Sequence, residues 1–317
     1  MNELTPFVSI IIAARPGQAE VLSAVAARTL DYPKDRLEIL IARGRQPSVQ
    51  RNRAVTEARG EFIYFLDDDS VPSEQNLRRG IELFRDAGVQ IVGGPNLVPS
   101  TAPPLEQAFG QVMGAWLAFG PSSARYRKIG VLRASGEKEL ILCNMMFRKA
   151  AFTEHGGFDE ALYPNEENAL MDSIQSAGGR LLYDPEFFVE RRPRPTVSAF
   201  ERMLMTYGRG RAEQFRLHPT LGSLPNFVPP AFLAYLLALP FLPPVLLWPL
   251  AIYALAVVAQ VSALNPCLIC GLPRLAPLIV LSHLCYGAGF WHGLFTRLKS
   301  RNQPSVGAVS LERVSPA

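Results

Sequence analysis

The feature that most constrains this chain is a nearly uncharged stretch in its last third. Residues 217–273 contain no Asp, Glu, Lys or Arg, and residues 275–296 are also uncharged. About 20 apolar residues are enough to cross a bilayer, so each part is long enough to span one. Residues 227–264 are too long for one straight helix, and the prolines Pro240, Pro243, Pro244 and Pro249 would break it. The stretch therefore predicts membrane-spanning segments.

The net charge supports the same prediction. The formal net charge is +4, and all of it lies beyond residue 216, because the first 216 residues balance. The charged residues beyond that point are Arg274, Arg297, Lys299, Arg301, Arg313 and Glu312. Basic residues beside apolar segments indicate that these flanks lie on the cytoplasmic side of a membrane. Nucleic-acid binding would need a basic face on the folded domain, and the balanced charge of the first 216 residues does not suggest one. We expect membrane lipids as partners, no nucleic acid, and a place in the cytoplasmic (inner) membrane.

Basic clusters on both sides of the apolar region favour an even number of crossings. Residues 191–216 hold seven Arg and two acidic residues, and residues 297–301 are also basic. Two spans are favoured, one within residues 227–264 and one through residues 275–296; three spans are the alternative. The excess length before Pro243 would form an interfacial or re-entrant half-helix. No signal peptide is expected at the N-terminus, so the first domain should face the cytoplasm.

The four cysteines suggest neither a metal site nor a disulfide framework. Cys267 and Cys270 form a C-x-x-C pair between two apolar segments, with no second pair and no neighbouring pair of histidines. We therefore expect them to pack as small apolar residues.

The residues before the apolar region alternate between strand-like and helix-like stretches. Residues 7–14 (FVSIIIAA) form a continuous apolar run typical of a strand buried on both faces. Further strands are expected at 37–42, 61–66 and 89–98, and helices at 18–31, 48–58 (with Ser48 as N-cap) and 73–87. Beyond them we expect helices at 105–119, 165–177 and 196–216, strands at 140–147 and 180–184, and a loop at 121–139. This order predicts an α/β fold with a doubly wound, mostly parallel sheet.

These patterns divide the chain into four regions. We expect an α/β catalytic domain over residues 1–195 and a basic amphipathic juxtamembrane helix with a linker over residues 196–225. The transmembrane region covers residues 226–298, and a polar tail covers residues 299–317.

Three consecutive carboxylates follow the third expected strand. Asp67, Asp68 and Asp69 come directly after the apolar run FIYFL. In an open parallel sheet the ligand crevice lies outside the carboxyl ends of the strands. Adjacent carboxylates repel one another, and Mg²⁺ or Mn²⁺ with substrate phosphates would offset that repulsion. A solvated acidic turn is the alternative.

Two later clusters leave two interpretations open. Glu166 and Glu167 begin an expected helix, where they could either cap the helix or remove a proton from an acceptor hydroxyl. Arg209 and Arg211 lie in the segment YGRGR. Their guanidinium groups could hold a diphosphate or lie on anionic lipid headgroups.

At these residues the chain resembles the family-2 glycosyltransferases of the GT-A type. The similarity covers residues 7–216 and rests on FVSIIIAAR, QRNRAVTEARGEFIYFLDDDSVP, GGFDE and PNEENALMDSIQSAGGRLLYDP. The later segment HLCYGAGFWHGL looks like the membrane tail of a polysaccharide-synthesis branch. The resemblance implies inverting transfer from a nucleotide-sugar.

The resemblance also implies roles for individual residues. Asp67 and Asp69 match the family's Asp-x-Asp metal motif, and Glu167 stands at the position of the catalytic base, with Glu166 before it. The family usually has base-gripping Asp residues after the second strand, where this chain has Ile41-Ala42-Arg43-Gly44. Contacts with the donor are expected from Ala14, Arg15, Arg43, Arg51, Asn52, Asp67, Asp68, Arg209 and Arg211.

The leading functional hypothesis is glycosyl transfer from a nucleotide-sugar to a membrane-associated acceptor, a lipid-linked glycan or polysaccharide. Metal-dependent nucleotidyl transfer is one alternative, but it usually requires a glycine-rich phosphate loop, and AARPGQ has only Gly17. A non-catalytic membrane scaffold with the same fold is the other alternative.

Overall fold

The computed structural model describes residues 5–160, 165–217, 219, 221–298 and 308–316. The chain divides into two compact units. The first unit contains the β-sheets and comprises Met1–Pro99, Ala124–Arg192 and Ser300–Ala317. The second unit is helical and comprises Ser100–Ser123 and Pro193–Lys299.

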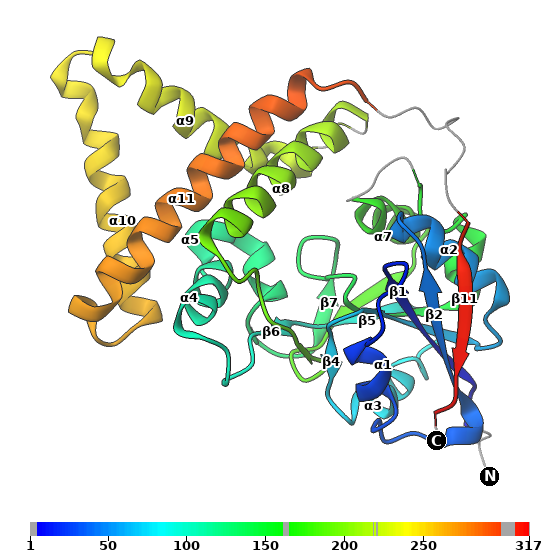
Figure 1. Cartoon of the computed structure of the whole chain (residues 1–317). Helices are drawn as coiled ribbons and strands as arrows, with labels where there is room; N and C mark the ends of the chain where they lie inside the picture. Colours follow the sequence, from blue (N-terminus) through cyan, green and yellow to red (C-terminus); the bar gives the residue numbers. More distant parts are fainter. Residues whose placement is uncertain (1–4, 161–164, 218, 220, 299–307, 317) are drawn as a thin grey trace. The chain divides into compact units, whose positions relative to one another are not determined.

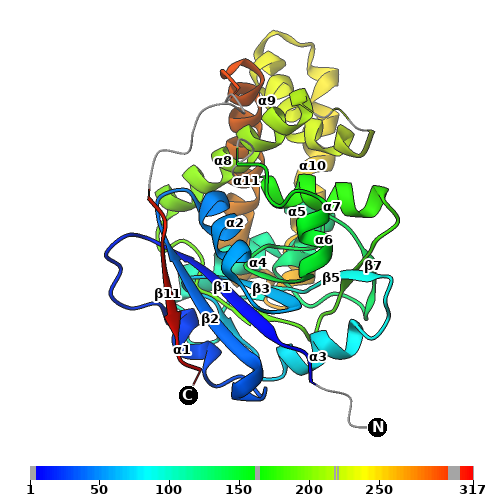
Figure 2. The same ribbon diagram turned by 90° about the vertical axis from the view of Figure 1, so that its right-hand side faces the viewer.

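The first unit is built on an eight-stranded sheet with the strand order β11-β2-β1-β3-β8-β5-β9-β7 (Figures 1 and 2). β2, β1 and β3 are parallel neighbours, and β8 runs antiparallel between β3 and β5. The strands are β1 (Val8–Ala14), β2 (Leu37–Arg43), β3 (Phe62–Asp67), β5 (Val89–Gly93), β7 (Arg133–Ser135), β8 (Asn144–Arg148), β9 (Arg180–Tyr183) and β11 (Ser310–Val314). This architecture confirms the expected α/β sheet.

Helices cover both faces of the sheet, as the apolar run of β1 predicts. Ile10 and Ile12 face one core, with residues of α1 (Leu22–Ala27) and α3 (Asn76–Leu83). Ile11 faces the other core, with residues of α2 (Pro47–Glu57), α6 (Lys149–Glu154) and α7 (Glu166–Ser176). A strand buried on both faces favours a nearly continuous apolar run such as VSIIIAA, and its one polar side chain, Ser9, donates a hydrogen bond to Glu38 at 2.6 Å.

Several local predictions were wrong, among them the loop expected at residues 121–139, where the structure has a 3-10 helix, Gly120–Arg125, and the strand β7. The strand expected at residues 89–98 divides into β5 and β6 (Asn96–Leu97), and β6 belongs to a second, three-stranded sheet with β4 (Val71–Pro72) and β10 (Val189–Glu190). A Cβ on Gly94 would lie only 2.0 Å from the carbonyl oxygen of Phe187, so the chain bends where only glycine fits. Ser48 is not an N-cap, because α2 already begins at Pro47 and the N-cap position is Gln46.

Among the described residues of the second unit, three helical segments are long and apolar enough to cross a membrane. They are Gly222–Phe241, Pro244–Leu264 and Leu268–Phe295, with mean hydropathies of 1.4, 2.0 and 1.7. The helices of this unit are α4 (Pro104–Met113), α5 (Trp116–Phe119), α8 (Val197–Leu217), α9 (Val228–Ala238), α10 (Trp248–Leu264) and α11 (Leu268–Phe295).

Glycines allow α8 and α11 to pack backbone against backbone (Figure 1). A Cβ on Gly208 would lie 2.1 Å from the carbonyl oxygen of Tyr286, and one on Gly289 would lie 2.1 Å from that of Met205. Small residues at helix contacts permit such close approach of the two backbones. They are enriched where helices pack within a membrane, because the hydrophobic effect does not drive helix association there. The glycine at position 208 of the YGRGR segment therefore has a packing role.

A hydrogen-bonded chain of polar groups joins α5, α10 and α11. The ring of His283 contacts the hydroxyl of Tyr253 at 2.7 Å and the carbonyl oxygen of Leu117 at 2.9 Å. Gln260 accepts a hydrogen bond from the Leu117 amide at 3.0 Å. Because a carbonyl only accepts, Nε2 of His283 carries the proton, and Nδ1 accepts from Tyr253. Polar groups among apolar helices are costly unless they are paired in this way.

The turn between α10 and α11 corrects the prediction for the cysteine pair. Cys267 and Cys270 form a disulfide, whereas the sequence favoured simple apolar packing. The C-x-x-C spacing alone does not show that the first turn of α11 places the two Cα atoms 5.4 Å apart, a distance that a disulfide can bridge.

The strand β11 was not anticipated, because the sequence suggested only a polar tail. It pairs antiparallel with β2 over five residues, from Ser310 opposite Arg43 to Val314 opposite Ile39 (Figure 1, red beside β2). β2 precedes the apolar region in the chain and β11 follows it. Two strands of one sheet must lie on the same side of a membrane, so this pairing requires an even number of crossings between them.

We therefore expect the C-terminus to lie on the same side of the membrane as the sheet. In a variant whose native cysteines are serines, Ser315→Cys should react with an impermeant thiol reagent only after the cells are permeabilised. Asn265→Cys, in the turn between α10 and α11, is the matched control and should react in intact cells. Labelling of Ser315→Cys in intact cells would mean an odd number of crossings and a different partner for β11.

Candidate functional site

The candidate site lies where β1, β2 and β3 end. Their carboxyl-terminal residues are Ala14, Arg43 and Asp67, which the parallel register places at one edge of the sheet. Gln50 of α2 holds two of these strand ends together: its side-chain nitrogen donates to the carbonyl oxygens of Ala14 at 2.8 Å and Ala42 at 2.6 Å. This is the edge at which open α/β sheets bind their ligands.

A buried arginine connects the two acidic motifs of the sequence. Arg51 of α2 donates to Asp67 with a nitrogen–oxygen distance of 2.7 Å and lies 3.5 Å from a carboxylate oxygen of Glu166. The side chain of Arg51 is 7% exposed and that of Glu166 is 2% exposed. Residues far apart in sequence therefore meet here, since Arg51 bridges the end of β3 and the start of α7.

A second arginine bridges two carboxylates of the aspartate run. Arg191, directly after β10, lies 2.8 Å from Asp67 and 2.5 Å from Asp69. Together these contacts form what we call the carboxylate–guanidinium chain, in the order Glu166, Arg51, Asp67, Arg191, Asp69. Burial raises the pKa of Asp69, the charge of Arg191 lowers it, and the neighbouring Asp67 and Asp68 raise it.

The donor set suits a divalent cation. Asp67 and Asp69 both direct oxygens at one positive group, the Arg191 guanidinium. Carboxylate oxygens are the ligands that Mg²⁺ and Mn²⁺ prefer. Across the described part of the chain, no group of three or more His, Cys, Asp or Glu side chains is assembled to hold a metal. Two carboxylates suffice when substrate phosphates and water complete the coordination.

The two glutamates at the start of α7 have different environments. Glu166 is buried against Arg51, whereas the side chain of Glu167 is only partly buried. Surrounding protein and the adjacent Glu166 raise the pKa of Glu167 to about 7, although Arg125 and Arg51 act to lower it. Desolvation also raises the pKa of Glu166, with Arg51 opposing that shift. A carboxyl with a pKa near neutrality is suited to proton transfer.

Arg125 fixes a loop next to these glutamates. Its guanidinium donates to the carbonyl oxygens of Lys138 and Glu137 and, at 3.2 Å, to the side-chain oxygen of Asn168 in α7. Asn168 follows Glu167 directly in the chain. Arg125 therefore fastens the loop of residues 125–139 to the helix that carries Glu167.

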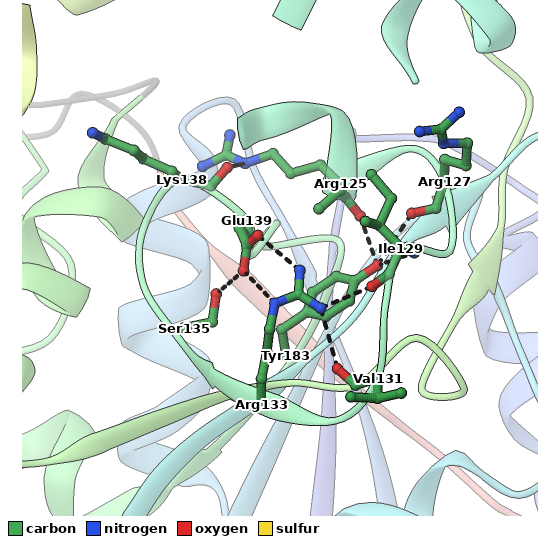
Figure 3. A network of polar contacts seen from close by, with 10 residues as sticks. Arg125, Arg127, Ile129, Val131, Arg133, Ser135, Lys138, Glu139 and Tyr183 are labelled. Atoms are coloured by element: carbon green, nitrogen blue, oxygen red, sulfur yellow. Dashed lines mark hydrogen bonds and ion pairs between the residues drawn. The ribbon is translucent and has the colours of Figure 1, made fainter. Parts of the chain in front are cut away.

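The same loop is folded around a second arginine, as Figure 3 shows. Arg133 pairs with Glu139 at 2.7 Å and donates to the carbonyl oxygens of Ile129 and Val131. Its guanidinium lies 4.3 Å from the centre of the Tyr183 ring, whose hydroxyl donates to the carbonyl oxygens of Ala124 and Arg127. These contacts fix the course of a segment that the sequence suggested only as a basic loop.

Other residues expected at the donor site have different surroundings. Asn52 exchanges two hydrogen bonds with the backbone of Phe158, at 2.8 and 2.9 Å, so its amide holds the GGFD loop. Arg15 is exposed in the turn after β1. Arg43 pairs with Glu312 of β11 at 3.0 Å. Direct contacts of these three residues with a donor stay predictions.

Arg209 and Arg211 lie in α8, in the second unit. Arg209 is 3.6 Å from Glu213, and Arg211 donates to Gln214 at 3.0 Å. A role in binding a diphosphate or lipid headgroups also stays a prediction for both.

Sequence reasoning missed Arg191 and Arg125. Arg191 begins the run RRPR, which was counted only as basic charge beside the membrane. The only clue to its role would have been its position directly after the strand β10. Because β10 has two residues, it is too short to be recognised from the periodicity of the sequence. Arg125 stands in a loop without any motif.

Comparisons with known proteins agree with this arrangement. Residues 2–206 match the family model "Glycosyltransferase like family 2". The succinoglycan biosynthesis protein ExoA of Rhizobium meliloti is 26% identical over 302 residues, which cover 92% of this chain and 87% of ExoA. The pre-mycofactocin glycosyltransferase of Mycobacterium tuberculosis is 26% identical over 173 residues, covering 55% of this chain and 36% of that protein.

A solved structure has a similar fold. The mannosyltransferase PcManGT from Pyrobaculum calidifontis, in complex with GDP-Man and Mn²⁺, superimposes with a TM-score of 0.58 at 16% identity, covering 92% of this chain and 88% of PcManGT. This likeness confirms the expected GT-A type of fold.

Removing Arg51 should destabilise the first unit. Arg51→Gln leaves Asp67 and Glu166 without their shared cation, and breaking a buried ion pair typically costs about 3–5 kcal/mol. Arg53→Gln is the matched control on the same helix, because Arg53 pairs with Glu57 on the surface. Such exposed pairs contribute about 0–1 kcal/mol. Thermal unfolding of the detergent-solubilised protein should show a clear fall in Tm for Arg51→Gln only. Equal Tm values would mean that the carboxylate–guanidinium chain does not hold the site together.

Proposed function

The chain belongs to the glycosyltransferase-like family 2, and we propose that it transfers a sugar from a nucleotide-sugar donor to a hydroxyl group of a membrane-associated glycan with inversion of the anomeric centre. The observation that carries this proposal is the carboxylate–guanidinium chain, in which Arg51 joins the aspartate run to the Glu166–Glu167 pair. A metal-binding motif and a catalytic base can act in the same reaction only if they lie close together in space.

In the proposed reaction, the acceptor oxygen attacks the anomeric carbon of the donor sugar. The bond from that carbon to the phosphate oxygen breaks, and the nucleoside diphosphate leaves with the bonding electrons. Glu167 takes the proton of the acceptor hydroxyl. Its partial exposure favours it over Glu166, whose buried carboxylate is already engaged by Arg51.

Asp67 and Asp69 would hold Mg²⁺ or Mn²⁺ together with the donor diphosphate. The bound cation would offset the negative charge that develops on the leaving group. Arg191 already bridges the two carboxylates and would keep them oriented before the donor arrives. Arg51 pairs with the other carboxylate oxygen of Asp67, Oδ1, which reduces the repulsion between Asp67 and Asp69.

The apolar helices support a membrane-borne acceptor, a lipid-linked glycan or a growing polysaccharide. Three segments are long enough to cross a membrane, and the relative ExoA is a polysaccharide biosynthesis protein by name. We place the protein in the cytoplasmic membrane with the sheet facing the cytoplasm, because nucleotide-sugars are cytoplasmic and the flanks of the apolar region are basic.

Metal dependence is the first expectation from this proposal. Asp69→Asn removes one anionic ligand, so binding of GDP or UDP with Mn²⁺ and sugar transfer should both fall by at least about tenfold. Calorimetry and a transfer assay would measure these losses, and circular dichroism would verify that the fold is intact. Full turnover in the presence of EDTA would refute the assignment of the metal site.

The base should be Glu167. Glu167→Gln cannot accept the proton and should lower kcat by about 10²–10⁴-fold with little change in donor affinity. Glu166→Gln tests the neighbouring carboxylate and should retain more activity per folded molecule. If Glu166→Gln alone abolishes turnover, the base is Glu166.

The pH dependence of turnover should follow the ionisation of Glu167. A base must be deprotonated, so with a pKa of about 7 the rate should fall as the pH drops below about 7. Arg125→Gln removes a charge that lowers this pKa, so the acidic limb of the pH–rate profile should move to higher pH. Arg127→Gln, an exposed residue of the same loop, should leave the profile in place. Identical profiles for all three proteins would exclude Arg125 from tuning the base.

A further inference from the structure

The C-terminal strand β11 brings a carboxylate to the end of β2. Glu312 accepts two hydrogen bonds from the Arg43 guanidinium, at 3.1 and 3.0 Å, and both contacts end on the same carboxylate oxygen, Oε2. Arg43 also donates to the carbonyl oxygen of Gln18, in the segment after β1, at 2.6 Å. The pair is therefore fixed between the ends of β1 and β2, and neither of the two bonds to Glu312 uses the other carboxylate oxygen, Oε1.

A cavity of about 210 Å³ adjoins this ion pair. The segment after β1, α1, β2 and β11 all contribute to its wall, which includes Val21, Ile41, Arg43, Glu312 and Val314. The side chain of Glu312 is 50% exposed, so a ligand can reach it. The wall combines apolar side chains with the charged residues Glu20, Arg28, Arg43 and Glu312. Small-molecule sites generally combine apolar walls with a few polar groups that orient the ligand.

Alternate residues of β11 serve opposite faces of the sheet. Arg313 pairs with Glu38 and donates to the carbonyl oxygen of Glu57 at 2.7 Å, on the α2 side. Its neighbour Glu312 faces the cavity on the α1 side. One strand therefore carries one residue that anchors it and one residue that faces the candidate ligand.

The distance from the cavity to the aspartates matches a nucleoside diphosphate. Arg43 is paired in register with Ala14, and Ala13 is paired with Asp67. Two strand spacings separate the end of β2 from the end of β3, which is about 10 Å. A diphosphate held at Asp67 and Asp69 would thus place its nucleoside near Arg43 and Glu312.

We propose that Glu312, supplied by the C-terminal strand, selects the base of the donor nucleotide in favour of guanine or uracil. Both bases present an imino N–H that a carboxylate accepts, and guanine adds an amino group beside it. Adenine and cytosine carry an unprotonated ring nitrogen at that place, which the carboxylate repels. The proposal rests on the proposed function, since it assumes a nucleotide-sugar donor.

Nucleotide binding to the full-length protein in detergent tests this proposal. Calorimetry with GDP, UDP, ADP and CDP in the presence of Mn²⁺ should show GDP and UDP binding at least about tenfold more tightly than ADP and CDP. Glu312→Gln should weaken GDP and UDP by about tenfold and leave ADP and CDP within about twofold. Arg313→Gln is the matched control, because it loosens the same strand on the opposite face and should preserve the selectivity.

The outcomes separate this inference from the proposed function. If the unaltered protein binds none of the four nucleotides, the nucleotide-sugar donor is wrong and the inference falls with it. If it binds nucleotides but Glu312→Gln keeps the original ratios, only the role of Glu312 is overturned. The same holds if Arg313→Gln changes the ratios as much as Glu312→Gln does, because the strand's stability and not its carboxylate would then be responsible.

Discussion

Charge compensation at one edge of the sheet is the constraint on which the candidate site depends. Three consecutive aspartates and two consecutive glutamates would repel one another if they were brought together uncompensated. Arg51 and Arg191 lie between these carboxylates, and each contacts two of them. The buried cation Arg51 is costly in isolation, as are the carboxylates, so the group is stable only as a whole. The fold brings four separate segments together to complete it.

The rest of the first unit supports this edge. Gln50 joins the ends of β1 and β2, Asn52 holds the loop before α7, and Arg125 ties the loop of residues 125–139 to α7. Gln50 and Asn52 donate to backbone carbonyl groups, and Arg125 donates to the side-chain oxygen of Asn168. Such bonds fix position more than they add stability, since a typical one contributes only about 1 kcal/mol. Position is what a site for group transfer requires.

The strand β11 joins the C-terminal part of the chain to the sheet formed by its N-terminal part. Strands β2 and β11 belong to the same sheet, and the apolar region lies between them in the chain. Their pairing restricts the membrane topology and places Glu312 beside Arg43. The edge of β2 would otherwise expose unpaired backbone groups, which invite association with other strands. A residue that follows the apolar helices in the chain therefore lies beside the ends of the first two strands.

The sequence alone determined the elements with strong local patterns. The buried run of β1, the aspartates after β3, the helix start at Glu166 and the uncharged stretch were all visible, because burial on both faces, charge repulsion and membrane thickness act on contiguous residues. Only the tertiary structure decided that Arg51 and Arg191 join the acidic motifs, that Cys267 bonds Cys270, and that the tail forms β11. The arginine contacts and β11 depend on segments that are distant in sequence, and the disulfide depends on the local turn geometry at the start of α11. An arginine, a cysteine pair or a short polar strand carries no periodic signal of its partner.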